Sequence, residues 1–214
     1  MFITVATPVG WMRFTFFVVA LMIVGYVVLT SWRSPSINPL KEGAVIVAFG
    51  DSLTQGVGVN KAQSYPAVLQ SLTGHKVINS GISGETTTEG LQRLDAVLVR
   101  YQPELVILLE GGNDILQNVP ASVIQENLSK MIEMAKARGI AVVLVGVPEK
   151  RLFAGTAPLY IELADTWQIP LEESIIARLM MRTSMKSDPV HFNERGYQAL
   201  AEAIYKTLQN SGAL

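Results

Sequence analysis

The sequence of 214 residues predicts an α/β domain in which a central parallel sheet of about five strands carries helices on both faces. One observation is that short apolar runs alternate with amphipathic stretches of helical length, the pattern of successive β–α–β units. Another is that the first apolar run is short and bounded by turn residues, which favours a buried strand of a parallel sheet. The expected strands are residues 44–49, 76–79, 104–110, 140–147 and 168–171, and the expected helices are residues 62–73, 87–101, 120–138, 157–167 and 193–208.

The connections that follow the first four expected strands are rich in glycine and small polar residues. They comprise residues 50–58, 80–85, 111–114 and 148–155. Because right-handed crossovers place the carboxyl ends of parallel strands at one edge of the sheet, these loops must share that edge. Ligands bind at this edge in α/β proteins. We therefore expect the functional site there.

A long apolar segment lies near the amino terminus. Residues 14–31 contain no charge and lie between Arg13 and Arg33, and a helix of this length is just sufficient to cross a bilayer core. The exit from the segment lacks the Ala-x-Ala pattern of a signal cleavage site, and Trp32 suits a membrane interface. We expect a retained membrane anchor with the rest of the chain on the extracytoplasmic, periplasmic side. A cleaved secretory signal is the alternative.

The domain boundaries follow from this composition. Residues 1–32 form the expected anchor or signal segment. Residues 33–43 contain two prolines and several polar residues, which is typical of a linker. Residues 44–214 then form a single α/β domain.

Net charge and cysteine content exclude several classes of function. The formal net charge is −1, so no basic surface argues for binding of nucleic acid. There is no cysteine, which excludes disulfides, thiol nucleophiles and cysteine-ligated metals. The two histidines are too few for the ligand set of a metallophosphoesterase.

Ser52 is the candidate nucleophile. It follows the first expected strand within Gly-Asp-Ser-Leu, on a tight turn that glycines on either side allow. A serine hydroxyl is barely ionised near neutral pH and needs a general base to attack a carbonyl carbon. The alternative is that Asp51 and Ser52 only cap the helix that follows, as these residue types often do.

His191 is the candidate base, and Asp188 is its partner. Asp188 lies three residues earlier, across a turn stiffened by Pro189, so its carboxylate can bind one ring nitrogen and fix the tautomer of the ring. The other nitrogen is then free to accept a proton from a hydroxyl. The alternative is an ordinary loop histidine near a helix cap. The second histidine, His75, precedes the second strand and so falls at the opposite edge of the sheet.

Hydrogen-bond donors are expected beside the serine. Asn113 follows two glycines at the end of the third strand, where its side-chain amide can point at developing negative charge. The backbone N–H groups of Gly84 and of Ser52 can do the same, which makes an oxyanion hole of three donors. Singly, each of these residues is equally typical of a turn. Together with the Asp-x-x-His pair, in order on one sheet edge, they predict a hydrolytic site.

These motifs resemble those of the GDSL esterases of the SGNH-hydrolase superfamily, most closely the bacterial branch of thioesterase/lysophospholipase enzymes and related arylesterases. The matching blocks are FGDSLTQG, VINSGISGETT, LLEGGND and DPVHFNERGY, and the resemblance extends over residues 45–208. It implies a flavodoxin-like three-layer fold and a triad of Ser52, His191 and Asp188 that works without metal or cofactor.

Two positions of the resemblance need comment. The Ser-Gly-Glu-Thr run aligns with Ser-Gly-Asp-Thr of the family, which places the oxyanion donor at Gly84, with Gly81 as the alternative. Phe192 stands where the family often has proline.

The expected function is hydrolysis of acyl ester or thioester bonds through an acyl-serine intermediate, of the lysophospholipase, acyl-thioesterase or arylesterase type. The expected substrate is a small acyl ester or a lipid. Leu152 and Phe153 are candidate contacts in the acyl pocket, with ordinary packing as the alternative. A carbohydrate O-acetylesterase on the same fold is the alternative function.

Two further functions are disfavoured. Phosphoryl transfer would use Asp51 after a buried strand, but Leu53 replaces the second acid of an Asp-x-Asp pair, and the glycine-rich loop lacks the Gly-Lys-Ser/Thr ending of a phosphate cradle. A binding module that has lost its chemistry is disfavoured because every catalytic position is filled.

Overall fold

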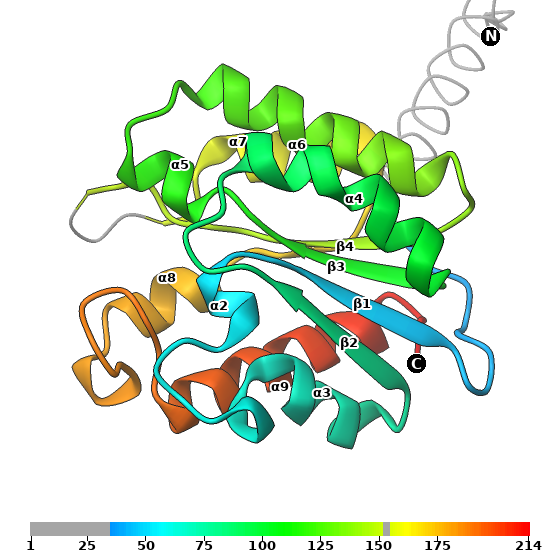
Figure 1. Cartoon of the computed structure of the whole chain (residues 1–214), viewed down its shortest axis with the longest axis horizontal. Helices are drawn as coiled ribbons and strands as arrows, with labels where there is room; N and C mark the ends of the chain where they lie inside the picture. Colours follow the sequence, from blue (N-terminus) through cyan, green and yellow to red (C-terminus); the bar gives the residue numbers. More distant parts are fainter. Residues whose placement is uncertain (1–34, 152–154) are drawn as a thin grey trace, which may run out of the picture. The chain divides into compact units, whose positions relative to one another are not determined.

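The structure is a computed structural model that describes residues 35–151 and 155–214. Within these residues a five-stranded sheet has the order β2-β1-β3-β4-β5, and every neighbouring pair is parallel (Figure 1). This order is that of flavodoxin-like sheets, in which ligands bind beside the first strand, where the winding reverses. The predicted α/β class with a parallel sheet is confirmed. The strands are β1 (Val45–Gly50), β2 (Lys76–Gly81), β3 (Leu105–Leu109), β4 (Ala141–Val145) and β5 (Leu171–Glu172).

Helices cover both faces of the sheet, which gives the described domain three layers (Figure 1). Helices α4, α6 and α7 lie on one face, whereas α3, α8 and α9 lie on the other. The short helices α2 and α5 directly follow β1 and β3. The helices are α2 (Ser52–Gln55), α3 (Tyr65–Thr73), α4 (Thr87–Tyr101), α5 (Gly112–Leu116), α6 (Ala121–Lys136), α7 (Pro158–Trp167), α8 (Ile175–Met180) and α9 (Glu194–Asn210), with the 3-10 helices η1 (Lys61–Gln63) and η2 (Thr183–Met185).

The core is built on the central strands. All of β3 is buried, as is β1 after its first residue. A parallel strand covered by helices on both faces must be apolar at every position, which explains the continuous run LVILL in β3. Three tyrosines, Tyr65, Tyr160 and Tyr197, are among the largest fully buried side chains and come from helices on both faces. The strands that lead into the carboxyl edge are therefore held firmly.

The fold differs from the sequence prediction in several places. Strand β5 spans Leu171–Glu172 instead of residues 168–171, and the short helices α2 and α5 were not predicted. Strand β2 continues through Ser80 to Gly81 instead of ending at residue 79, because these two residues pair with Phe49 and Gly50 of β1. Helix α8 is absent from the prediction. Its six residues are too few to show a helical period, although Ile176 and three other residues of the helix are buried.

The predicted localisation at a membrane is corrected by the structure. No helix in residues 35–151 or 155–214 is both long and apolar enough to cross a bilayer. The segment predicted as an anchor or secretory signal, residues 14–31, lies outside the described residues.

The first described residues run along the carboxyl terminus. The N–H groups of Ile37 and Leu40 donate to the carbonyl oxygens of Ser211 and Ala213 at 2.8 and 2.9 Å. Residues 35–214 form one compact unit. Part of the predicted linker is thus packed on the domain, and the predicted boundaries at residues 32 and 43 stay predictions.

We expect Gly111→Ala to lower the free energy of unfolding by about 2–4 kcal/mol. The backbone φ of Gly111 is 102°, which L side chains rarely adopt, and the added Cβ would lie 2.4 Å from the hydroxyl oxygen of buried Tyr160. Gly139→Ala is the matched control, because its φ is 72° but the added carbon meets no atom within 4 Å. The control should lose only about 1–2 kcal/mol. Urea unfolding measures both, and equal losses would contradict the overlap at Tyr160.

Candidate active site

Ser52 is placed by the end of strand β1. The strand is buried up to Gly50, and the chain then turns directly into the four-residue helix α2. Asp51 is the N-cap of this helix, because its Oδ1 accepts a bond of 2.9 Å from the N–H of Leu53. The capping alternative thus holds for Asp51 but not for Ser52, whose hydroxyl contacts a histidine instead.

His191 reaches Ser52 from the loop before α9. Its Nε2 lies 3.0 Å from Ser52 Oγ, and its Nδ1 lies 2.7 Å from Asp188 Oδ2. A proton on Nδ1 bonds to the carboxylate and leaves Nε2 as the acceptor for the serine hydroxyl. The structure therefore brings together three residues that lie up to 139 positions apart in the sequence.

Asp188 is held as a carboxylate. The backbone N–H of His191, the ring of the same residue and the N–H of Val190 bind it, and together they lower its pKa to about 2. Both N–H groups donate to Oδ1 at 2.8 Å, while Oδ2 binds the ring. Because both oxygens have partners, the orientation of the carboxylate fixes that of the ring.

The loop that carries His191 is tied to the segment after α2. Phe192 is fully buried and packs edge-on against Tyr197, with ring centroids 5.7 Å apart. The hydroxyl of Tyr197 donates to the carbonyl oxygen of Val57 at 2.8 Å. Phe192, the departure from the usual proline of the resembled family, thus anchors the loop by packing.

Asn113 lies at the start of α5 and lines the same cavity as Ser52. Its Nδ2 donates a bond of 2.8 Å to the carbonyl oxygen of Glu85, and the amide has a second N–H for another acceptor. The next residue, Asp114, accepts from the N–H and the hydroxyl of Thr87 at 2.8 and 2.7 Å. These bonds tie α5 to the start of α4 and hold the amide in one orientation.

Gly84 fits the role of a backbone donor better than Gly81 does. The N–H of Gly81 donates to Oδ1 of Asn79 at 3.0 Å, and a Cβ at Gly81 would lie 2.1 Å from the backbone nitrogen of Gln55. Gly81 therefore serves the packing of β2 against α2. Within the described residues, no acceptor binds the N–H of Gly84, which is exposed and has a φ of 83°. Gly84 does not line the cavity beside Ser52.

A cavity of about 430 Å³ opens beside Ser52. Its apolar lining comes from the helices α2, α5 and α8, from the loop after β4 and from the loop before His191. The apolar residues are Leu53, Ile115, Leu116, Val147, Pro148, Ile176, Met180, Pro189 and Val190, and four charged residues, Asp51, Glu149, Lys150 and Arg151, line it as well. The sequence prediction missed Ile176 and Met180 together with their helix. The predicted substrate contacts Leu152 and Phe153 lie outside the described residues.

Four carboxylic acids are buried around the carboxyl edge, namely Asp51, Glu85, Glu110 and Asp114, each at most 5% exposed. Burial and the neighbouring charge of Asp51 raise the pKa of Glu110 well above its usual range, so Glu110 is neutral. Burial also raises the pKa of Asp51 to about 6. In the described residues no group of three or more such side chains is arranged to hold a metal ion. No local sequence signal predicts this cluster, because its members follow three different strands, β1, β2 and β3.

Several known proteins are similar to this chain in sequence and in fold. Residues 48–199 match the model of the GDSL-like lipase/acylhydrolase family. The chain is 35% identical to esterase TesA of Pseudomonas aeruginosa over 122 residues. This aligned region covers 55% of this chain and 59% of that protein. It is 33% identical to an arylesterase of Vibrio mimicus, over 76% of this chain and 87% of that protein. It is 27% identical to thioesterase 1/protease 1/lysophospholipase L1 of Escherichia coli strain K12, over 86% of this chain and 89% of that protein. A crystal structure of TesA matches with a TM-score of 0.69 and 28% identity, over 77% of this chain and 98% of that chain.

We expect Asp51→Asn to remove a pH-dependent loss of stability. The pKa of Asp51 is about 6 in the folded chain and 3.8 ordinarily. The folded state therefore binds the proton more tightly, and the free energy of unfolding falls as the pH rises from about 4 to about 6. Asparagine keeps the cap but cannot ionise. The variant should exceed the original chain in stability by roughly 1–3 kcal/mol at pH 7.5.

Guanidinium unfolding at several pH values measures this difference. It should shrink to near zero at about pH 3.5, since Asp51 is then largely protonated in both states. Protonation of Asp188 at low pH affects both chains equally and cancels. A stability difference that does not change with pH would contradict the burial of an ionised Asp51.

Proposed function

The chain belongs to the GDSL-like lipase/acylhydrolase family, which makes it a carboxylic ester hydrolase, and we propose that it works through a covalent acyl-Ser52 intermediate. The observation that carries this proposal is the pair of bonds that joins Asp188 to His191 and His191 to Ser52, at 2.7 and 3.0 Å. A hydroxyl, a base and an orienting carboxylate in this order constitute an activated nucleophile.

In the first half of the reaction, His191 accepts the Ser52 proton at Nε2 while Oγ attacks the carbonyl carbon of the substrate. The carbonyl oxygen becomes an oxyanion, and the N–H groups of Ser52 and Gly84 and the amide of Asn113 donate to it. Asp188 stabilises the imidazolium that forms. His191 then gives its proton to the leaving alkoxide or thiolate, and the acyl group stays on Ser52.

In the second half, water replaces the leaving group. His191 accepts a proton from the water, whose oxygen attacks the acyl carbon, and the same donors hold the second oxyanion. The His191 side chain is 21% exposed, so water can reach the ring. Collapse of this intermediate releases the carboxylic acid, and the proton on His191 returns to Ser52 Oγ.

We propose that the cavity beside Ser52 takes the acyl chain of the substrate. Its lining is largely apolar, which suits a hydrocarbon chain, and its volume of about 430 Å³ would be mostly unfilled by an acetyl group. This favours longer acyl esters over acetylated carbohydrates. The relatives named arylesterase and thioesterase 1/protease 1/lysophospholipase L1 support aryl esters, acyl thioesters and lysophospholipids as substrate classes.

We expect Ser52→Ala and His191→Gln each to lower kcat by at least about 10⁴-fold, because either change removes the activated nucleophile. His75→Gln is the matched control, since His75 precedes β2 at the opposite edge of the sheet. It should keep kcat within about twofold. The measurement is the hydrolysis of 4-nitrophenyl esters with acyl chains of two to sixteen carbons, with circular dichroism to verify folding. A folded Ser52→Ala variant with full turnover would overturn the proposed function, and a preference for acetyl esters would overturn the proposed acyl cavity.

We expect Asn113→Ala to lower kcat by about 10²- to 10³-fold with little change in KM, because the amide donates to an oxyanion that exists only in the transition state. Asn210→Ala, at the exposed end of α9, is the control and should keep both constants. Steady-state kinetics on one ester measures the two variants. A rise in KM at constant kcat would show that Asn113 binds the ground state instead.

A further inference from the structure

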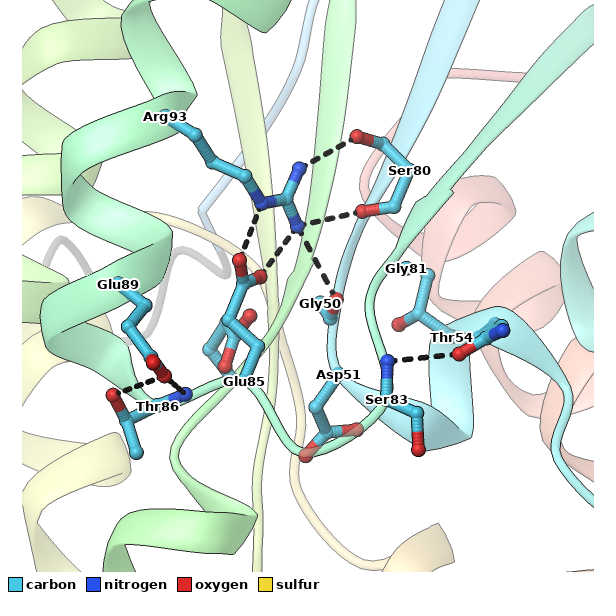
Figure 2. A network of polar contacts seen from close by, with 12 residues as sticks. Gly50, Asp51, Thr54, Ser80, Gly81, Ser83, Glu85, Thr86, Glu89 and Arg93 are labelled. Carbon is cyan, nitrogen blue, oxygen red and sulfur yellow. Dashed lines mark hydrogen bonds and ion pairs between the residues drawn. The ribbon is translucent and has the colours of Figure 1, made fainter.

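Arg93 on α4 binds the chain segments around the proposed oxyanion hole (Figure 2). Its guanidinium makes two bonds of 2.5 Å to the carboxylate of Glu85, one from Nε and one from Nη2. Two further bonds, of 2.9 and 2.8 Å, go to the hydroxyl and the carbonyl oxygen of Ser80, and a longer one of 3.4 Å goes to the carbonyl oxygen of Gly50. The guanidinium carbon also lies 3.9 Å from the ring centroid of Phe49.

The residues that this guanidinium binds are close in the chain to the three proposed donors. Gly50 ends β1, two residues before Ser52. Glu85 directly follows Gly84, and the carbonyl oxygen of Glu85 accepts the bond of 2.8 Å from Asn113 Nδ2. One cation therefore connects the segments that carry all three donors.

The loop that contains Gly84 is attached to the Arg93 guanidinium at Glu85, the residue after Gly84. The N–H of Ile82 donates to the carbonyl oxygen at the end of β1 at 2.9 Å, and that of Ser83 donates to Oε1 of Gln55 at 2.8 Å. These bonds hold the start of the loop, whose residues 82–84 are exposed. Its end is held by a bond of 3.2 Å from the N–H of Glu85 to the carbonyl oxygen of Ile82 and by the Glu85 side chain, which is 4% exposed and pairs with Arg93. A buried carboxylate without its partner is strongly unfavourable, so the pair keeps this end in place.

We propose that Arg93 is a positioning residue of the hydrolase, and that through Glu85 it holds the Gly84 N–H and the Asn113 amide where the oxyanion forms. The proposal rests on the donor roles proposed above for those two groups. Stabilisation of an oxyanion depends on donor positions to within a fraction of an ångström, so a displaced loop lowers kcat more than it changes substrate binding. Lysine cannot replace arginine here, because it is a point charge without the planar fork that binds both carboxylate oxygens.

The test is Arg93→Lys in the full chain, assayed for kcat and KM with an acyl ester. We expect kcat to fall by about 10- to 100-fold and KM to stay within about threefold. Arg100→Lys is the matched control, because Arg100 is an exposed arginine of the same helix. It should keep both constants. Thermal unfolding of each variant verifies that it is folded at the assay temperature.

A double-mutant cycle with Asn113→Ala separates positioning from a general structural role. If Arg93 acts through the oxyanion hole, Arg93→Lys should lower kcat by a much smaller factor in the Asn113→Ala background than in the original chain. Independent losses that multiply would overturn the proposal, as would a folded Arg93→Lys variant with kcat within twofold of the original.

Two more outcomes are decisive. Should Arg93→Lys fail to fold, the same cycle is run with Glu85→Gln, which removes the charge and keeps the shape of the side chain, and the same kcat loss and coupling are expected. Failure of both variants to fold would assign the pair to stability and overturn the proposal. Retention of activity by Ser52→Ala would instead refute the proposed function itself, so the two failures are distinguishable.

Discussion

Strand β1 is hydrogen-bonded to β2 on one side and to β3 on the other, and the site depends on this central position. The register pairs Gly50 with both Gly81 and Leu109, so the three strands end level with one another. The segments that leave them carry the proposed nucleophile Ser52, the Gly84 loop and Asn113, which therefore start from one edge of the sheet. Because β1 and β3 are buried on both faces, they cannot shift without exposing apolar side chains. The precision of the site is thus a consequence of core packing.

This arrangement brings four carboxylic acids into the protein interior, and the fold accommodates each in a different way. Glu110 is protonated, Asp51 caps a helix, and Asp114 accepts two bonds from Thr87. Glu85 pairs with Arg93, the cation that also binds the ends of β1 and β2. Groups with perturbed pKa values often gather at functional sites, because the geometry that chemistry requires overrides the preference of each group for water. Two of the four acids, Glu85 and Asp114, also join the segments around the proposed oxyanion hole through their bonds to Arg93 and Thr87.

Much of the site could be predicted because its parts are local in the chain. The Gly-Asp-Ser-Leu turn follows an apolar run, and Asp188 and His191 lie three residues apart, so each pattern can be recognised within a few residues. Helix α4 has the predicted bounds of residues 87–101, because its apolar residues repeat at the helical period over the 15 residues of the helix. A topological rule places the loops that carry Gly84 and Asn113 at one edge of the sheet. The choice of Gly84 over Gly81 came from the resemblance to the family.

By itself the sequence determined the α/β class and the parallel sheet, since periodicity and chain order suffice for these. The Ser–His–Asp constellation was predicted from motif spacing together with the resemblance to the family. Only the tertiary structure decided that Ser52 and His191 are in contact, that α8 supplies Ile176 and Met180 to the cavity, and that Arg93 reaches Glu85, Ser80 and Gly50. It also contradicted the predicted membrane localisation, as no helix of residues 35–151 or 155–214 can span a bilayer. The physical reason is that such contacts join residues from separate elements. Periodicity in the sequence shows which face of a helix is buried but not which residues of another element that face contacts.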